Sequence, residues 1–229
     1  MKLIVSEAIL EKFGNATIGA LHFKISSIGV SDLSTVITEA KNNSVKCFLA
    51  EFSDVNFAEI PQVKLWSSIF EKMNVKKGRE SSIVFLSNHV LERKDLFSIS
   101  PFVDLYNAIS LKYGIPMGGY NIANFFGDIE LRVARKGEEF FGIGSKQVEK
   151  TSANEVVYSD GQGVFCRCWN DKDCDRTKIV DGITDILYVF DGIDQKAPIE
   201  CAIEEIVKTL SISDFTSGIA EKTTPCIEI

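Results

Sequence analysis

The spacing of apolar residues changes near the middle of this 229-residue chain, and this change constrains the fold more than any other feature. Up to Gly114, apolar residues recur mostly at intervals of three and four, the period of a helix with one buried face. From Asp128 onward, short runs rich in β-branched and aromatic residues alternate with turn sequences such as Asp160-Gly161-Gln162-Gly163. Helices followed by mixed strands predict an α+β fold, in which a helical N-terminal half packs on mixed β-sheets, and not a regularly alternating parallel sheet.

The individual elements follow from this periodicity and from the turn residues between them. Helices are predicted over residues 7–13, 31–42, 63–73, 81–91, 101–113 and 199–210, and strands over residues 16–25, 128–134, 138–141, 155–158, 164–169 and 186–190. Ser31 is the expected N-cap of the second helix, and a four-residue loop is expected at the Asp160-Gly161 turn. The sequence contains no linker-like run, so one domain is predicted over residues 1–229, with an N-terminal portion (1–75), a motif-bearing core (80–192) and a closing helix (197–210).

The balance of charges bears on possible partners. The chain has 25 Lys and Arg against 32 Asp and Glu, a formal net charge of −7, which argues against nucleic-acid binding through bulk positive charge but leaves room for a small basic groove. No run of about 18 apolar residues is present, so no membrane partner is expected. The N-terminus lacks the apolar centre of a signal peptide, and the six scattered cysteines are most simply reduced thiols. The protein is therefore expected in the cytoplasm.

Common catalytic and cofactor motifs are missing from the sequence. It has no phosphate-binding loop, and residues 141–146 contain only part of the dinucleotide-binding fingerprint. Cys166, Cys168 and Cys174 lack a nearby fourth ligand, so buried thiols are favoured over a metal site, and neither a metal nor another cofactor is predicted. Neither histidine is placed as a general base, so carboxylates, amides, backbone groups or the substrate itself would have to position water in a hydrolysis.

The first candidate segment is residues 100–120. Asp104 and Asn107 share one face of the predicted helix, beside an apolar stripe, where they can fix the amine or hydroxyl of a ligand. The alternative is that both side chains cap or hydrogen-bond nearby backbone, a common role for Asp and Asn. Gly118 and Gly119 belong to a Gly-x-Pro-x-Gly-Gly run that predicts a loop in which backbone N–H groups approach a ligand closely.

The second candidate segment is residues 166–178, at the exit of a predicted strand. Arg167 and Trp169 would point the same way on that strand and offer a cation beside a flat π-surface, which suits a nucleotide base, a terminal adenosine or an aromatic side chain. The alternative is an internal salt-bridge network, with Arg176 paired to Asp173 or Asp175.

Together these segments resemble the B3/B4 domain of the phenylalanyl-tRNA synthetase beta subunit and, more closely, the free-standing B3/4-domain proteins. The resemblance covers about residues 80–192. Its motifs are Val103-Asp104-Leu105-Tyr106-Asn107, Gly114-Ile115-Pro116, Ile129-Glu130-Leu131-Arg132, Glu155-Val156-Val157-Tyr158, Arg167-Cys168-Trp169-Asn170 and Asp175-Arg176-Thr177-Lys178.

The resemblance implies a B3/B4-type α+β fold, a tRNA acceptor end or aminoacyl-tRNA as the partner, no DNA partner, and an editing reaction. The synthetase module hydrolyses tyrosine wrongly esterified to phenylalanine tRNA. Such an ester is already activated, so orienting one water supplies much of the catalysis without a histidine nucleophile.

Site residues follow from the resemblance, position by position. Asn107 matches an asparagine of the editing pocket, and Asp191 lies near the position of the synthetase's tyrosine-sensing glutamate, so these two are the candidate catalytic residues. Tyr106 takes the place of a threonine and Gly118 that of a histidine. The candidate substrate-binding residues are Asp104, Tyr106, Gly118, Gly119, Arg167, Trp169, Asn170, Asp175, Arg176 and Thr177.

Three functions remain open on these grounds. The first is a trans-editing hydrolase of mischarged aminoacyl-tRNA, the second a module that binds tRNA or an amino acid without chemistry, and the third a small-molecule binder that reuses the pocket. A tRNA acceptor end needs few phosphate contacts, so the net charge predicts weak, salt-sensitive tRNA affinity. The local cations that would make those contacts are Lys76, Lys77, Arg79, Arg132, Arg135, Arg167 and Arg176.

Overall fold

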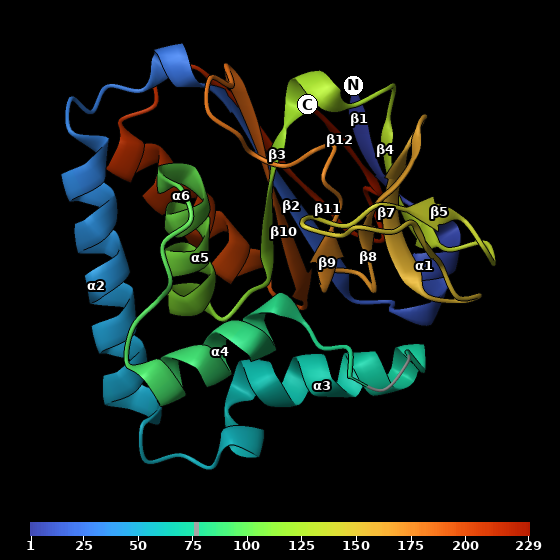
Figure 1. Ribbon diagram of the computed structural model, residues 1–229, viewed down its shortest axis with the longest axis horizontal. Helices are drawn as coiled ribbons and strands as arrows, with labels where there is room; N and C mark the ends of the chain where they lie inside the picture. Colours follow the sequence, from blue (N-terminus) through green and yellow to red (C-terminus); the bar gives the residue numbers. More distant parts are fainter. Residues whose placement is uncertain (76–77) are drawn as a thin grey trace.

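In the computed structural model, which describes residues 1–75 and 78–229, two β-sheets pack face to face, and helices cover one outer face and one end of the pair (Figure 1). The first sheet is antiparallel throughout and consists, in spatial order, of β11 (Phe215–Ala220), β2 (Ala16–Lys24), β10 (Asp185–Ile193) and β3 (Met117–Asn121). The second consists, in spatial order, of β12 (Cys226–Glu228), β1 (Lys2–Val5), β4 (Ile129–Val133), β7 (Val156–Asp160), β8 (Gly163–Arg167) and β9 (Lys172–Asp173). The strands β5 (Glu139–Phe140) and β6 (Glu149–Lys150) pair with each other as a separate two-stranded sheet that contacts β8.

The helices divide into a layer and an end cover. In the layer, α5 (Pro101–Tyr113) and α6 (Lys196–Leu210) lie on the outer face of the four-stranded sheet, and α2 (Leu33–Phe52) packs against α5 (Figure 1). The end cover consists of α3 (Pro61–Met73) and α4 (Ser82–Arg93), while α1 (Glu7–Lys12) packs beside β4. None of the helices in the described residues is long and apolar enough to cross a membrane.

Strand β10 separates two apolar cores. Tyr188 and Phe190 point toward the helical layer, whereas Leu187 and Val189 point toward the six-stranded sheet, because successive side chains of a strand face opposite ways. Asp191 is the next residue of the series that faces the second sheet, and it is only 2% exposed. The fold therefore carries a carboxylate into the space between the two sheets.

The predicted α+β class is confirmed, and α5 has the predicted limits. Pro101 is its first residue and Gly114 ends it in the left-handed conformation (φ +65°). The second helix differs from the prediction: its N-cap is Asp32, not Ser31, because the Asp32 carboxylate accepts a hydrogen bond from the N–H of Thr35 (3.1 Å). This helix also runs to Phe52 instead of residue 42.

The Gly-x-Pro-x-Gly-Gly run was wrongly predicted to be a loop, since Met117–Asn121 is strand β3. Gly118 pairs with Val189 and Gly119 with Tyr188 of β10. A Cβ atom on Gly118 would lie 2.4 Å from the hydroxyl oxygen of Tyr120, so the glycine makes room for a side chain of the protein itself.

Two further predictions at the β7–β8 hairpin need correction. Asp160 pairs directly with Gly163, so the loop has two residues, not four. The strand predicted over 164–169 ends at Arg167 because the chain turns sharply over the next residues. The short strands β1, β3, β6, β9, β11 and β12 were not predicted.

Candidate functional site

A small cavity lies between the two sheets, at the end where α4 begins. Its volume is ≈ 80 Å³. The lining residues come from α4, α5, β3, β8, β9, β10 and the turn after β8, and they are Ser82, Tyr106, Asn107, Met117, Gly118, Tyr120, Cys166, Asn170, Asp171, Asp173, Val189 and Asp191. Most of these side chains are polar, so the cavity is an interruption of an otherwise apolar core.

Asp191 is the most heavily hydrogen-bonded group of the cavity. Its Oδ1 atom accepts hydrogen bonds from the hydroxyl of Tyr158 (2.5 Å) and the indole N–H of Trp169 (3.0 Å), and its Oδ2 atom accepts one from the amide of Asn170 (3.2 Å). Burial raises the pKa of Asp191 to about 7, although the three donors pull it down. Near neutral pH this carboxyl can therefore both accept and release a proton.

A second carboxylate, Asp173, faces the same cavity from β9. Its Oδ1 atom accepts a hydrogen bond from the hydroxyl of Tyr120 (2.9 Å), and burial raises its pKa. Cys166 lies next to it on β8, where the bulge of the β7–β8 ladder turns both Phe165 and Cys166 inward. Burial raises the pKa of the Cys166 thiol well above its ordinary value, so the thiol is protonated and is a poor nucleophile.

Four polar groups of the cavity lining have no hydrogen-bond partner among the residues that the structure describes. The Oγ atom of Ser82 and the Oδ1 atom of Asn170 are fully buried, and the side-chain amide of Asn107 and the hydroxyl of Tyr106 face the cavity. Asn107 is only 7% exposed, and a buried polar group without a partner costs free energy. A ligand or water that supplied the missing partners would recover that cost.

The turn after β8 places Trp169 and Asn170 against Asp191. Cys168 and Trp169 both adopt left-handed backbone conformations (φ +49° and +68°), which cost a non-glycine residue roughly 1–2 kcal/mol each. Two of the contacts that hold the turn come from outside it: the N–H of Trp169 donates to the C=O of Val156 (2.7 Å), and the N–H of Ser82 donates to the C=O of Asn170 (3.2 Å).

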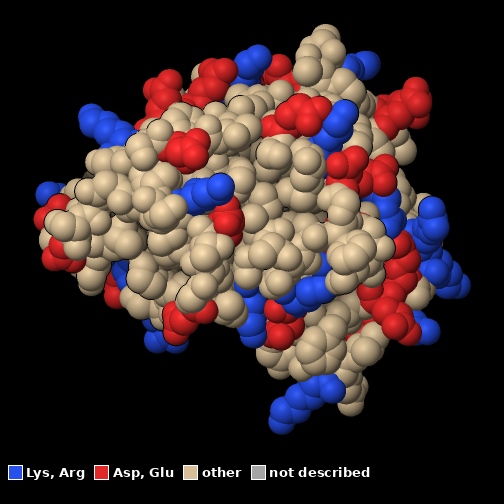
Figure 2. All heavy atoms as spheres, turned by 90° about the horizontal axis from the view of Figure 1, so that it is seen from above, with Lys and Arg blue, Asp and Glu red and all other residues tan. Residues whose placement is uncertain are grey.

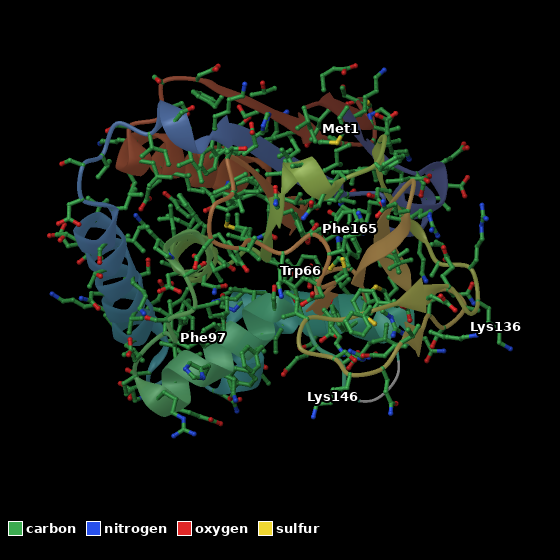
Figure 3. The ribbon with its side chains drawn as sticks, turned by 45° about the horizontal axis from the view of Figure 1, so that its top comes forward. Met1, Trp66, Phe97, Lys136, Lys146 and Phe165 are labelled. Carbon is green, nitrogen blue, oxygen red and sulfur yellow. The ribbon has the colours of Figure 1, made fainter. Side chains whose placement is uncertain are left out.

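The Trp169 ring is fully buried. It packs edge to face against Phe13 (5.0 Å between centroids) and Trp66 (5.4 Å), and Trp66 is labelled near the centre of Figure 3. Trp169 contributes to the site through its indole N–H, which donates to the Asp191 carboxylate.

Five residues selected from the sequence line this one cavity: Tyr106, Asn107, Gly118, Asn170 and Asp191. Gly119 lies one position away on β3 and faces the helical layer, where a Cβ atom would come within 2.7 Å of the ring of Tyr106. Trp169 lies directly behind Asp191.

The interpretation of Arg167 and Trp169 as an exposed stacking platform is wrong. Trp169 is 0% exposed, and the left-handed turn removes it from the strand, so its ring offers no surface to an external base. Arg167 is 5% exposed and forms a two-pronged ion pair with Glu155 (2.7 and 2.9 Å), with Glu149 at 3.1 Å. Arg167 therefore stabilises the fold.

The other selected residues also lie outside the cavity lining. Asp104 accepts a hydrogen bond from the N–H of Ile99 (2.7 Å), which is the capping role that its sequence position allowed. Arg176 forms a two-pronged ion pair with Asp160 (2.8 and 2.9 Å), not with Asp173 or Asp175. Asp175 pairs with Lys178 (2.6 Å), and Thr177 is fully buried beside Cys174 (3.3 Å).

Tyr158, Tyr120 and Asp173 also contribute to the site and were not predicted from the sequence. Tyr158 ends the Glu-Val-Val-Tyr motif, and its position within a recognised motif was the available signal. Asp173 belongs to a run of acids that pointed equally well to a solvated turn, and Tyr120 follows two glycines that suggested a loop. Their convergence depends on the stacking of β3, β7 and β9, which no local pattern specifies.

Most of the cations proposed for phosphate contacts are paired within the fold. Arg79 pairs with Asp171 (2.7 Å) and Arg132 with Glu138 (2.5 Å), in addition to the pairs of Arg167 and Arg176. Arg135 is exposed, and Lys76 and Lys77 lie outside the described residues. Figure 2 shows basic and acidic side chains interspersed over the face that it presents, and Figure 3 shows Lys136 and Lys146 extending outward from peripheral loops.

The cysteines of the second segment are free thiols. The Cys166 Sγ atom donates to the C=O of Trp169 (3.2 Å), and burial raises the pKa of Cys168 to about 12. Within residues 1–75 and 78–229, no group of three or more His, Cys, Asp and Glu side chains is arranged to hold a metal ion.

Residues 70–224 match the family model of the B3/4 domain. Two curated relatives are phenylalanine–tRNA ligase beta subunits. The protein from Chromobacterium violaceum is 39% identical over 72 residues, 31% of this chain and 9% of the relative. The protein from Neisseria meningitidis serogroup B is 36% identical over 75 residues, 33% of this chain and 9% of the relative. The chain thus spans a small fraction of the length of these relatives.

A solved structure resembles the whole chain more extensively. It is the crystal structure of an N-terminal fragment of the phenylalanyl-tRNA synthetase beta subunit from Pyrococcus horikoshii, with a TM-score of 0.50 and 10% sequence identity over 94% of this chain and 49% of that chain. At this identity the likeness concerns the fold alone. Because the family model matches more than half of its residues, this chain belongs to the B3/4 domain family.

Proposed function

We propose that this protein binds the acceptor end of tRNA and hydrolyses the ester bond of mischarged aminoacyl-tRNA in the cavity around Asp191. The observation that carries the proposal is that a member of the B3/4 family brings Asn107, Asn170 and Asp191 to one cavity and leaves some of their polar atoms without partners. Similarity to tRNA ligase beta subunits supports a function related to tRNA.

The proposed reaction needs a base and a donor. With a pKa of about 7, Asp191 accepts a proton from a water molecule as the water oxygen bonds to the ester carbonyl carbon. The unpartnered amide of Asn107 donates to the carbonyl oxygen as negative charge develops there. The bond from that carbon to the ribose oxygen then breaks, and the proton passes from Asp191 to the ribose oxygen, leaving free amino acid and tRNA.

A deacylation assay tests the proposal. Wild-type protein is incubated with a panel of tRNAs, each charged with a wrong amino acid, and release of the labelled amino acid is followed. We expect release from at least one substrate, and a loss of about 10²-fold or more in Asp191→Asn and Asn107→Ala, because each removes a group that acts on the reacting atoms. Asn43→Ala, on the exposed side of α2, is the matched control and should retain the wild-type rate.

No release above buffer from any substrate would refute hydrolysis. Unchanged rates in both cavity variants would refute the assignment of the site.

A second function is binding without chemistry, and one observation favours it. The carboxylate of Asp191 already accepts three hydrogen bonds from Tyr158, Trp169 and Asn170, which leaves little capacity for a water molecule. This alternative predicts retention of tRNA in filter binding at low salt, equal for charged and uncharged tRNA, with no turnover.

A further inference from the structure

The cavity is too small for an aromatic ring. Its volume is ≈ 80 Å³. An apolar protein cavity that takes up benzene measures about 150 Å³. An amino-acid side chain of about two to four non-hydrogen atoms fits without rearrangement, whereas the ring of tyrosine or phenylalanine does not.

Two tyrosines of the protein itself keep the cavity small. The hydroxyl of Tyr120 lies where a side chain at position 118 would begin, and its hydrogen bond to Asp173 (2.9 Å) fixes it there. The Tyr120 ring packs edge to face on Phe165, with centroids 5.1 Å apart. Tyr106 packs in the same way on Tyr188 (5.7 Å), so neither ring can withdraw without losing core contacts.

The unpartnered polar atoms specify the chemistry of the occupant. The Oδ1 atom of Asn170 is buried and can only accept a hydrogen bond, while the hydroxyls of Ser82 and Tyr106 and the Asn107 amide can donate or accept. A ligand with a hydroxyl group and an ammonium group supplies donors for these atoms. An aliphatic side chain of the same size would fill the volume but leave these polar atoms unpaired, so it would bind more weakly.

We propose that the cavity selects a small hydroxyl-bearing aminoacyl group, serine or threonine, and rejects aromatic amino acids. This inference rests on the proposed function, since it names the substrate class of the same site. Tyr106 and Tyr120 determine the size limit, and Asn170 together with the Tyr106 hydroxyl determines the preference for a hydroxyl group.

Deacylation of one tRNA body, chemically acylated with serine, threonine, alanine, tyrosine or phenylalanine, tests this substrate class. We expect seryl and threonyl esters to be released at least about tenfold faster than the alanyl ester, because the site is built to pair a hydroxyl group. Tyrosyl and phenylalanyl esters should remain at the buffer rate. Release of tyrosine or phenylalanine as fast as serine would overturn the inference while leaving the proposed hydrolase intact.

A binding measurement separates failure of the inference from failure of the hydrolase. Thermal shifts are recorded with serinamide, threoninamide, alaninamide and tyrosinamide, which carry no ester. Stabilisation by serinamide and threoninamide alone supports the selection of small hydroxyl-bearing side chains, even if no ester is hydrolysed. Stabilisation by tyrosinamide, or by none of the four, contradicts the rule.

Two substitutions at one position separate volume from hydroxyl chemistry. Tyr106→Thr keeps a hydroxyl group and removes the ring, so it should admit tyrosyl and phenylalanyl esters and amides. Tyr106→Phe keeps the ring and removes the hydroxyl group, so it should reduce the preference for serine over alanine without admitting tyrosine. Identical selectivity in both folded variants and the wild type would show that Tyr106 does not set the specificity.

Discussion

The polar groups around the cavity differ from the arginines of the second sequence segment in whether the fold supplies their hydrogen-bond partners. Around the cavity, the hydroxyl of Tyr106 and the amide of Asn107, both on α5, and the buried Oδ1 atom of Asn170, in the turn after β8, have no partner within the described residues. By contrast, Arg167 at the end of β8 and Arg176 beyond β9 each form a two-pronged ion pair with a carboxylate. Charged groups with complete sets of partners stabilise a fold, whereas buried polar groups without partners indicate where a ligand belongs.

If this distinction is correct, Arg167→Ala should give the largest loss of stability in the molecule outside the apolar cores. It leaves the buried carboxylate of Glu155 without its ion-pair partner, which typically costs about 3–5 kcal/mol. Urea denaturation at pH 7 measures the loss. Arg135→Ala, at an exposed arginine of the same part of the chain, is the control and should show no measurable change.

A loss below about 1 kcal/mol for Arg167→Ala would mean that the pair is dispensable for the fold. The buried position of Arg167 would then not be explained by stability, and Arg167 would again be a candidate for ligand binding.

The pH dependence of stability distinguishes Asp191 from the paired carboxylates. Its pKa in the folded protein, about 7, lies above the unfolded value of about 3.9, so the folded state binds more protons between these pH values. The contribution of Asp191 to stability therefore falls as pH rises from about 4 to 7, by at most about 1.4 kcal/mol per pH unit, and is constant above that range. Urea denaturation of the wild type and Asp191→Asn across pH 4–8 isolates the effect as their difference.

The stability of Asp191→Asn relative to the wild type should therefore rise with pH through this window. A difference that stays constant, or that falls with pH, would contradict a raised pKa.

Tyr158→Phe should have a smaller effect that depends on the charge of Asp191. The Tyr158 hydroxyl donates to this carboxylate, and a hydrogen bond to a charged group contributes about 1.5–3 kcal/mol. The loss should be close to this value at pH 8, where Asp191 is ionised, and smaller at pH 5. Tyr188→Phe is the matched control, because Tyr188 lies on the face of β10 opposite to Asp191 and its hydroxyl donates to the neutral C=O of Phe102 (2.8 Å). Its loss should not change with pH, and equal pH profiles for the two variants would refute the assignment.

The parts of this structure that depend on local patterns were predictable from the sequence. Pro101 and Gly114 mark the ends of α5 because a fixed φ begins a helix and a left-handed residue ends one. The resemblance to the B3/4 family brought Asn107 and Asp191 together, although they are far apart in the chain. Periodicity alone could not have paired them.

Other features depend on tertiary packing and could not be predicted from the sequence. Alternation along a strand predicts that Arg167 and Trp169 face the same way, but two consecutive left-handed residues end the strand between them. Arg176 finds its partner at Asp160, on a neighbouring hairpin, rather than among the adjacent acids. Strand β3 contains two adjacent glycines, a composition that disfavours strands, and its pairing with β10 and its bridge to Lys178 hold it extended.

Asn107→Ala should have the smallest effect on stability. It tests most directly the distinction between polar groups that have partners in the fold and those that do not. The side-chain amide of Asn107 has no hydrogen-bond partner among the described residues, so its removal should change the free energy of unfolding by less than about 0.5 kcal/mol, and it could even stabilise the protein. The same substitution should abolish the thermal shift caused by serinamide. Asn170→Ala provides the contrast, because the amide of Asn170 donates to Asp191 and its loss should cost about 1–2 kcal/mol. If Asn107→Ala instead costs as much as Asn170→Ala, its amide has a structural partner in solution, and the absence of one no longer marks this cavity as a ligand site.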